Sequence, residues 1–368
     1  MSGTRGAGSP FINGVYYPSW RVYKQLPPSA LQLDCVNRVY YAFVLVNEDG
    51  TLRFLDEYAD CQISADGAKG CLTALANVKQ QRNTPNNNNS KNIKALVSIG
   101  GGSGSKEFPA LAAHRSRRTT LAKACRELVD RFGFDGIDLD WEHPQSDADG
   151  KNYVALLEAL RAALPASAGY ELTTALPVGE YVLRHIDLAR AARSLDYLHL
   201  MCYDFNGAWT SVCGHQSKLF TQSSSGSGSL ADVHPELRRS GQGAVAYVTA
   251  RGVPARQIVL GVPAYARSFG GAHGPGQPFQ SHGEMDYVDL PLEWVRNARI
   301  DRDAGAAFYV DESQGGKGFV TFDVPETVRR KAEYVKSQGL AGLFYWTGVG
   351  DMKGPDSLVR AGYEALNS

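Results

Sequence analysis

The chain has 368 residues and a mass of 39.9 kDa, a size that a single α/β barrel domain commonly reaches. Lysine plus arginine and aspartate plus glutamate each total 38, so the formal net charge is zero and the composition argues against a nucleic-acid partner. No segment approaches the roughly 20 apolar residues of a membrane span, and the first ten residues lack the apolar core of an export signal. We therefore expect a monomer without nucleic-acid or membrane partners, located inside the cell unless the chain is a trimmed form of a secreted protein.

Short β-rich segments alternate with helix-length segments along the whole chain. Apolar residues recur at three- and four-residue spacing in Ser116–Arg131 and Tyr153–Leu164, and Glu326–Gln338 is a further helical segment. Strands that alternate with helices run parallel, and eight such units predict a closed (β/α)8 TIM barrel with functional groups at the C-terminal ends of its strands. The predicted strands are Gly14–Tyr17, Arg38–Val46, Lys94–Gly100, Phe134–Trp141, Glu171–Leu176, Tyr197–Tyr203, Gln257–Pro263 and Gly342–Trp346.

Four carboxylates lie in the short fourth strand segment, at Asp135, Asp138, Asp140 and Glu142. The last three alternate with apolar residues, which is the period of a strand, so they share one face although strands disfavour aspartate. Side chains two residues apart on a strand lie roughly 6–7 Å apart, so the charges interact and one carboxyl should keep a proton near neutral pH. A protonated carboxyl beside an ionised one is typical of glycosidic-bond cleavage. The alternative is a buried polar layer without chemistry, and for the out-of-phase Asp135 it is a structural role at the start of the strand.

The stretch between Pro263 and Gly342 is too long for one crossover connection. We therefore predict a small α+β insertion between the seventh and eighth strands, residues 268–323, which would form one wall of the cleft. The whole chain, residues 1–368, is predicted to be a single catalytic domain that contains this insertion. Two polar tracts, Thr84–Ser90 and Gln222–Ser229, are predicted to be surface loops.

The six cysteines do not form a pattern typical of a metal site. Neither a Cys-x-x-Cys nor a His-x-x-x-His spacing occurs, so we expect no metal and no cofactor. Cys35, Cys125 and Cys202 lie in apolar segments, where a free thiol behaves as a small hydrophobic side chain. Most cysteines are therefore predicted to be reduced, with Cys61 and Cys71 as the favoured pair if one bridge forms.

The acidic segment resembles the Asp-x-x-Asp-x-Asp-x-Glu signature of family 18 glycoside hydrolases, the chitinases and their relatives. Four further motifs resemble those of the same family, occur in the family's order, and lie at the ends of predicted strands. They are Ser98-Ile-Gly-Gly101, Met201-Cys-Tyr203-Asp204, Gly261-Val-Pro-Ala-Tyr265-Ala-Arg267 and Tyr345-Trp346. Together with the acidic segment, they cover the chain from about residue 12 to its C-terminus.

The resemblance implies catalytic roles for Glu142, Asp140, Asp138 and Tyr203. In this family the N-acetyl group of the substrate replaces the second carboxylate as nucleophile. Glu142 would then be the general acid, and Asp140 would bind the acetamido N–H and turn the carbonyl oxygen toward the anomeric carbon. Asp138 would share a proton with Asp140, and Tyr203 would bind the acetamido carbonyl.

The same resemblance implies a set of substrate-binding residues. Trp346 would form the floor under the distorted sugar, and Trp209 would be a platform on the leaving-group side. Arg267 would reach the cleft or, equally well, form a surface ion pair, while Trp20 and Trp294 show no role beyond packing. The candidate substrate-binding residues are Tyr16, Phe43, Ser98, Gly101, Met201, Asp204, Trp209, Tyr265, Arg267 and Trp346.

Three positions depart from the pattern of the family. His143 follows the acid where the family commonly has tyrosine, and it could change the pH optimum. Gly102 stands where a tryptophan is frequent, which predicts weaker binding of long chains on the leaving-group side. The insertion has Tyr287-Val-Asp-Leu-Pro291 in place of a tyrosine-rich opening, which predicts a lower cleft wall. These departures argue against tight, processive action on crystalline chitin.

The function implied by the resemblance is retaining hydrolysis of β-1,4 bonds in chitin or chito-oligosaccharides. One alternative is a chitin-binding lectin of the same fold, although such relatives typically lack the acid that this chain has at Glu142. A second alternative is an endo-β-N-acetylglucosaminidase that acts on N-glycans by the same chemistry.

Overall fold

The computed structural model describes residues 10–84, 92–221 and 233–368. Of the two polar tracts predicted as loops, the first lies outside the described residues except for Thr84, and the second lies outside them entirely. Within the described ranges, we found no helix with the length and apolar character that a bilayer crossing requires.

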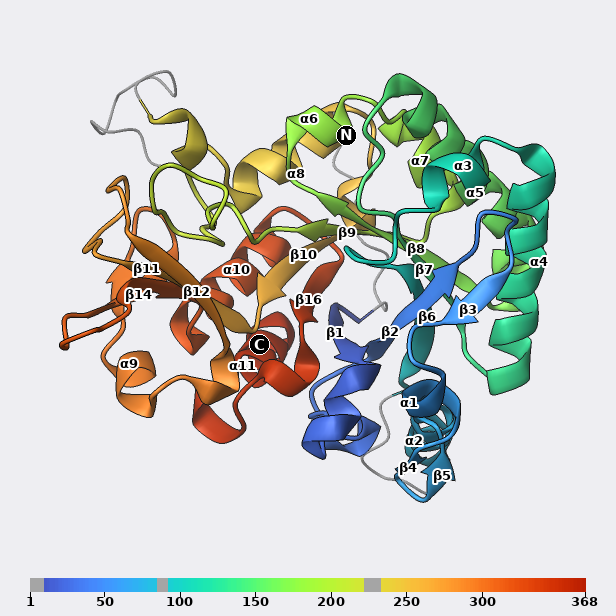
Figure 1. Cartoon of the computed structure of the whole chain (residues 1–368), viewed down its shortest axis with the longest axis horizontal. Helices are drawn as coiled ribbons and strands as arrows, with labels where there is room; N and C mark the ends of the chain where they lie inside the picture. Colours follow the sequence, from blue (N-terminus) through green and yellow to red (C-terminus); the bar gives the residue numbers. More distant parts are fainter. Residues whose placement is uncertain (1–9, 85–91, 222–232) are drawn as a thin grey trace.

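Eight parallel strands close into a barrel in which β1 pairs with both β2 and β16 (Figure 1). The predicted TIM barrel is confirmed, and the strands follow the order β1-β16-β10-β9-β8-β7-β6-β2. The fourth predicted strand is shorter than expected, since Asp135 precedes β7 and Trp141 follows it. The barrel strands are β1 (Ile12–Pro18), β2 (Arg38–Val46), β6 (Lys94–Gly100), β7 (Gly136–Asp140), β8 (Glu171–Pro177), β9 (Tyr197–Met201), β10 (Ile258–Pro263) and β16 (Gly342–Trp346).

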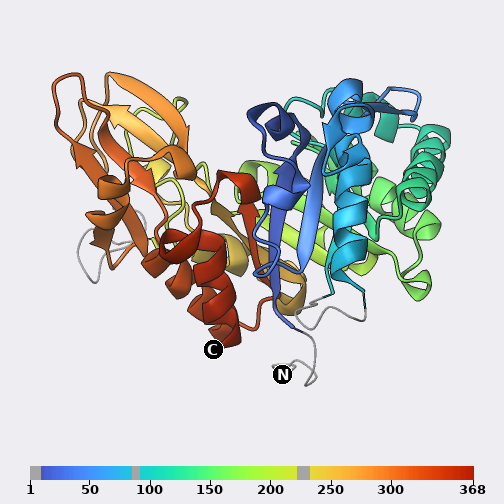
Figure 2. The same ribbon diagram turned by 90° about the horizontal axis from the view of Figure 1, so that it is seen from below.

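Helices cover the outer face of the barrel, and short elements fill several of its loops (Figures 1 and 2). The three predicted helices correspond to α4, α5 and α10. The helices are α1 (Glu57–Cys61), α2 (Cys71–Arg82), α3 (Phe108–Ala112), α4 (Arg115–Phe132), α5 (Asp147–Ala163), α6 (Glu180–Leu183), α7 (Leu188–Ser194), α8 (Gly241–Ala250), α10 (Pro325–Ser337) and α11 (Leu358–Asn367). The short strands β3 (Leu52–Phe54), β4 (Ser64–Ala65) and β5 (Ala68–Lys69) lie between β2 and α2.

Successive side chains of each barrel strand point alternately outward and inward, so the strands contribute to two separate cores. On β7, Ile137 and Leu139 face outward into the large cluster that packs against the helices, whereas the intervening Asp138 and Asp140 are 0% and 3% exposed inside the barrel. A smaller apolar cluster, which includes Tyr40 and Phe344, fills part of the barrel interior. The barrel is therefore a packed core whose polar residues are confined to particular layers.

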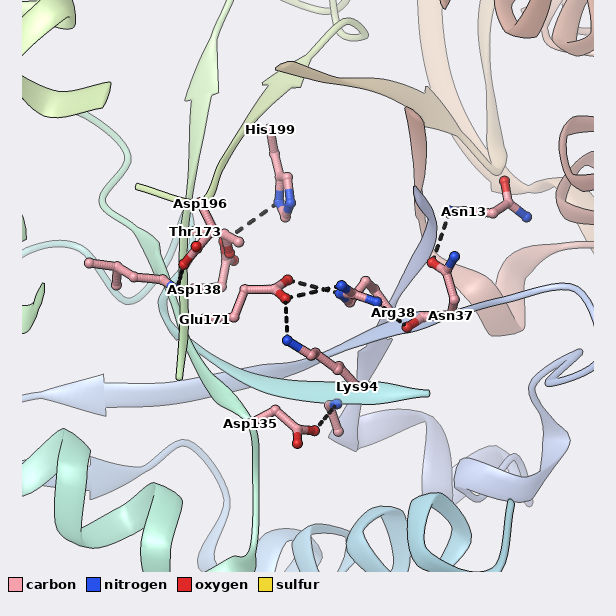
Figure 3. Close-up of polar contacts among 12 residues, drawn as sticks. Asn13, Asn37, Arg38, Lys94, Asp135, Asp138, Glu171, Thr173, Asp196 and His199 are labelled. Atoms are coloured by element: carbon pink, nitrogen blue, oxygen red, sulfur yellow. Dashed lines mark hydrogen bonds and ion pairs between the residues drawn. The ribbon is translucent and has the colours of Figure 1, made fainter. Parts of the chain in front are cut away.

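One such polar layer lies below Asp138, at the N-terminal end of the barrel. Glu171 on β8 is 4% exposed and accepts hydrogen bonds from Arg38 Nε (2.8 Å) and Arg38 Nη2 (3.1 Å) (Figure 3). Lys94 Nζ donates to the same carboxylate at 3.1 Å. Burial alone would raise the pKa of Glu171, but the two cations outweigh burial and lower that pKa below its ordinary value. The layer is an ionised triad that joins β2, β6 and β8.

Between β10 and β16 the chain forms a five-stranded antiparallel sheet with one short helix, which lies beside the barrel in both views (Figures 1 and 2). Its strands follow the order β12-β11-β15-β14-β13. A bidentate ion pair joins Arg21, after β1, to Asp286 of this sheet, with Nη2 2.7 Å from Oδ1. The elements are β11 (Tyr265–Gly270), β12 (Ser281–Asp286), α9 (Leu292–Arg296), β13 (Arg299–Asp301), β14 (Ala306–Asp311) and β15 (Gly318–Phe322).

All six cysteines are free thiols in this structure. The sequence predicted mostly reduced cysteines, with Cys61 and Cys71 as the pair only if one bridge formed. Cys61 ends α1, Cys71 begins α2, and no bridge joins them. Cys71 is buried instead within 3.8 Å of the Tyr17 hydroxyl.

Candidate active site

A cavity of about 650 Å³ opens at the C-terminal ends of the barrel strands and reaches the inserted sheet. It is large enough for a sugar ligand, since ligand sites commonly measure about 300–1,000 Å³. Asp138, Ser98 and Gly101 lie behind its wall, while the other predicted site residues line it. The predicted lining residues are Asp140, Glu142, Tyr203, Tyr16, Phe43, Met201, Asp204, Trp209, Tyr265, Arg267 and Trp346.

Asp138 is fully buried and held by three hydroxyl groups from three other strands. Its Oδ2 accepts from Tyr16 Oη at 2.7 Å and from Ser98 Oγ at 2.8 Å. Thr173 Oγ1 donates to the other oxygen, Oδ1, at 2.7 Å (Figure 3). Each oxygen therefore has a fixed orientation, and Oδ1 has room for one further donor.

His199 on β9 extends this network below Tyr16. Its Nδ1 lies 3.0 Å from Tyr16 Oη and 3.5 Å from Asp138 Oδ1. Because the Tyr16 hydroxyl already donates to Asp138, its oxygen must accept from a protonated Nδ1. Complete burial lowers the pKa of His199, which agrees with a neutral ring whose proton is on Nδ1. His199 thus orients Tyr16, which in turn orients Asp138.

Asp140 lies two residues after Asp138, at the C-terminal end of β7, between Asp138 and the cavity. It is 3% exposed, and its Oδ1 has no hydrogen-bond partner among the described residues. Burial raises the pKa of Asp140 well above its ordinary value, and the nearby Glu142 and Asp138 raise it further. Burial and the neighbouring acids therefore favour the protonated form of Asp140, and one side of this carboxyl remains free for a ligand.

Glu142 follows the strand and is held through its backbone. Its N–H donates to Ser105 Oγ at 2.9 Å, and the Ser105 hydroxyl donates to the Gly101 carbonyl at 2.8 Å. Burial and then the negative charge of Asp204 raise the pKa of Glu142 to about 7. A carboxyl with that pKa can give up and retake a proton near neutral pH, as a general acid and base must.

Asp204 accepts the hydrogen bonds of a polar network on another wall of the cavity. Its Oδ1 accepts from Tyr265 Oη at 2.6 Å and from Arg267 Nε at 2.7 Å. Arg267 Nη2 also lies 3.2 Å from a carboxylate oxygen of Glu284, on β12 of the inserted sheet. Arg267 therefore lies at the cavity and bridges two acids there, which favours the first of its two predicted placements. Tyr203 packs edge-on against Tyr265, with 6.1 Å between ring centroids.

Aromatic side chains form the floor and one end of the cavity. Trp346 stacks on Phe43, with centroids 5.6 Å apart and planes 20° apart. Trp20 lies 6.3 Å from Phe43 and 6.5 Å from Trp346, so it extends this surface, although the sequence indicated only packing for it. Gly101 has a φ of +82°, and an added Cβ would lie 2.6 Å from the Phe43 ring. Only glycine fits there, because a side chain would displace that ring.

At the other end of the cavity, Trp209 is 55% exposed, and the Arg267 guanidinium lies 4.9 Å from its ring. Tyr181, 54% exposed, and Arg239 line the same end, with the guanidinium of Arg239 5.8 Å from the Tyr181 ring. Exposed aromatic rings of this kind suit the apolar faces of sugar rings.

Asp135 does not belong to the site. Its Oδ2 accepts from Lys79 Nζ at 2.9 Å and from the Ala95 N–H at 2.8 Å, at the start of β7. Its structural role, one of the two readings of the sequence, is the one that this geometry favours. Among the described residues, histidine, cysteine and acidic side chains do not gather in a group that could hold a metal ion.

The model of the family described as "Glycosyl hydrolases family 18" matches residues 13–351. The chain belongs to glycosyl hydrolase family 18. It is therefore a glycoside hydrolase. Chitinase 1 of Aphanocladium album is 31% identical over 391 residues, which cover 100% of this chain and 88% of the relative. Endochitinase 1 of Metarhizium robertsii is 30% identical and covers 95% of this chain, with 84% of the relative covered.

Solved structures of family 18 share the fold. The Group IV chitinase of Ostrinia furnacalis matches with a TM-score of 0.84 at 23% identity, covering 98% of this chain and 100% of that chain. A class V chitinase from Nicotiana tobaccum, a mutant in complex with NAG4, matches with a TM-score of 0.79 at 25% identity. That match covers 97% of this chain and 99% of the other.

Several residues around the family 18 site were missed by the sequence analysis. The motifs pointed to strand ends, whereas His199 and Thr173 lie lower in the barrel and act on Asp138 from beneath. The alternation of side chains along a strand could have indicated His199, because it lies two residues before Met201 and therefore faces the same side of β9. Ser105 lies in the connection after β6 and Glu284 lies on β12, and the sequence pattern predicted the course of neither segment.

Proposed function

We propose that this family 18 hydrolase cleaves β-1,4 bonds between N-acetylglucosamine units of chitin or chito-oligosaccharides, with retention of configuration and with the substrate's N-acetyl group as nucleophile. The observation that carries the proposal is the free Oδ1 of the buried Asp140, placed between the fixed Asp138 and a Glu142 whose pKa is about 7. A buried carboxyl with an unused oxygen at a cavity is suited to bind a polar group of a ligand.

In the proposed first step, Glu142 gives its proton to the glycosidic oxygen as the bond to the anomeric carbon breaks. The acetamido carbonyl oxygen attacks the same carbon and forms an oxazolinium ion. Asp140 leaves its proton with Asp138 Oδ1, which has room for one more donor, and accepts the acetamido N–H. Its negative charge then balances the positive ring.

In the second step, water attacks the anomeric carbon from the side that the leaving group vacated. Glu142, now ionised, takes the proton of this water, and the oxazolinium ring opens to restore the acetamido group. Two displacements at one carbon give net retention. In this proposal Tyr203 donates to the acetamido carbonyl, and Trp346 supports the distorted sugar.

The names of the relatives support this substrate, because the two curated relatives described above are a chitinase and an endochitinase. The tobacco structure adds a family member in complex with a chito-oligosaccharide. The lectin alternative is less well supported because Glu142 is present, and the N-glycan alternative because the relatives are chitinases. We further propose that residues 1–368 act as a single catalytic domain and as a monomer.

Replacing the acid tests the proposal. Glu142→Gln keeps the shape of the side chain but removes the transferable proton, so kcat on chitohexaose should fall about 10²–10⁴-fold. The control is Glu158→Gln on the outer helix α5, where a half-exposed glutamate pairs with Arg190. Release of oligomers by Glu142→Gln at a rate near that of the wild type would contradict the proposed role.

A further inference from the structure

A second cavity, of about 350 Å³, lies directly beside the catalytic one. The two share three lining residues, Gly102, Glu142 and His143, so Glu142 stands at the boundary between them. The second cavity reaches along the segment that follows β6 and the start of α5. Its volume lies at the lower end of the range for ligand sites.

Gly102 determines how freely the two cavities connect. A Cβ added there would lie 3.6 Å from Glu142 Oε1, which is an ordinary contact, and the φ of this glycine lies outside the left-handed region. Neither the backbone nor close packing therefore requires glycine at this position, in contrast to Gly101. A side chain at position 102 would occupy the space beside Glu142 where the two cavities adjoin, and we refer to this space as the passage between them.

The lining of the second cavity is polar. Ser103 and Lys106 contribute donors on one side, and the side chains of Gln145 and Asp149 lie on the other. Asp149 Oδ2 accepts from the Gln145 N–H at 3.1 Å, so this wall is partly fixed. Ser103, Lys106 and Gln145 can donate to hydroxyl, ether or carboxylate oxygens, whereas Asp149 can accept only from a hydroxyl or another donor. Such a lining does not favour an apolar group.

The structure of the leaving sugar indicates which of its substituents could enter the second cavity. Glu142 protonates the oxygen on C4 of that sugar, and the ring positions next to C4 carry O3 on one side and C6 with O6 on the other. A group attached to O3 or O6 therefore starts close to Glu142, at the mouth of the second cavity.

We propose that this cavity is a side pocket of the leaving-group site and accepts a small polar substituent on O6 or O3 of the sugar that cleavage releases. Gly102 leaves room for the substituent, and the enzyme therefore cleaves substituted chains as well as unsubstituted ones. This inference rests on the proposed hydrolysis of chito-oligosaccharides.

The test compares chitohexaose with its 6-O-carboxymethyl and 3-O-carboxymethyl derivatives. For each protein, the measured quantity is kcat/KM for a derivative divided by kcat/KM for chitohexaose, so partial misfolding of a variant cancels. Gly102→Trp should narrow the passage and lower this ratio on the order of 10- to 100-fold, the range typical of shape discrimination in a pocket. Gly102→Ala, the matched control, should change the ratio less than about threefold, because a methyl group leaves most of the passage open.

The derivative that the wild type cleaves identifies the position of the substituent. Ser103→Trp, which narrows the same cavity from its polar wall, should lower the ratio in the same direction and serves if Gly102→Trp does not fold. An equal ratio in the wild type and the tryptophan variants would overturn the inference, as would a wild type that cleaves chitohexaose but neither derivative. A wild type that cleaves no chitohexaose would overturn the proposed function itself.

Discussion

Tyr16 and Tyr17 are neighbours on β1 but face opposite sides of the barrel wall. The Tyr16 hydroxyl donates to Asp138 inside the barrel, whereas the Tyr17 hydroxyl donates to the Leu26 carbonyl at 2.9 Å in the outer core. A hydrogen bond to a buried carboxylate contributes about 1.5–3 kcal/mol. Tyr16→Phe should therefore lower kcat roughly 10- to 100-fold, because Asp138 loses a donor that fixes its orientation.

Tyr17→Phe is the matched control for that change. It removes one hydroxyl from the same strand, and it should lower the free energy of unfolding by about 1 kcal/mol without a comparable loss of kcat. Equal losses of kcat in the two variants, measured on chitohexaose, would show that the network beneath Asp138 does not act on the reaction.

The raised pKa of Glu142 predicts the basic side of the pH profile. Glu142 must carry a proton to act as an acid, so kcat/KM should fall as the pH rises above about 7. Burial is the first cause of that pKa and the charge of Asp204 the second. Asp204→Asn removes the repelling charge, so the pKa of Glu142 should fall and the basic limb should move to lower pH.

The profile is measured as kcat/KM between pH 4 and 9. Asp130→Asn, which removes an acid from the outer helix α4, serves as the control and should leave the basic limb in place. If the basic limb of the kcat/KM profile lies at the same pH in Asp204→Asn as in the wild type, then Asp204 does not raise the pKa of Glu142.

The carboxylates in the upper part of this site could be singled out from the sequence for a specific reason. Asp138, Asp140 and Glu142 broke the rule that strands avoid aspartate, so they stood out from an apolar segment. His199 and Thr173 broke no rule, since one polar residue in an alternating strand is ordinary. Their contacts with Asp138 depend on the registers of β7, β8 and β9, which only the closed barrel fixes.

The Arg38, Glu171 and Lys94 triad joins three strands far from the cavity. Glu171→Gln would leave the buried guanidinium of Arg38 without its main partner, which costs about 3–5 kcal/mol of the free energy of unfolding. Because folding lowers the pKa of Glu171, its stabilisation is fully present above its ordinary pKa of 4.5 and is lost as the pH falls from there through the lower pKa of the folded state. The difference between the wild type and this variant should therefore be smaller at pH 4, where this loss has begun, than at pH 7.

Urea denaturation at pH 7 and pH 4 measures that difference. Glu158→Gln, in the half-exposed pair with Arg190, is the control and should cost less than about 1 kcal/mol. A loss of similar size in both variants would contradict a stabilising role of the triad.

Most barrel elements were predicted within a few residues, and the errors have local causes. The helix expected from Tyr153 begins at Asp147, because Ser146 Oγ accepts the Asp149 N–H and caps it. The apolar spacing starts about two turns later than the cap, so periodicity alone placed the start too late. The strand expected to reach Tyr203 ends at Met201, since the chain turns there to place Asp204, whose φ is +58°.

The inserted sheet shows what the sequence pattern could not predict. An α+β insertion was expected from the length of the connection, but its individual strands were not located, because residues such as Ser281–Asp286 are mostly polar and half exposed. Their pairing depends on β11, which follows directly after the barrel strand β10. This arrangement places Arg267 and Glu284 at the cavity, while the Arg21–Asp286 ion pair joins the sheet to the loop after β1.

The most direct test of the proposed mechanism is the configuration of the first products from chitohexaose. Proton nuclear magnetic resonance during the first minutes of cleavage distinguishes the α and β anomers of the new reducing end before they interconvert. Attack by the N-acetyl group followed by water predicts that the β anomer appears first. Initial release of the α anomer would contradict the mechanism, since it would require a single displacement by water.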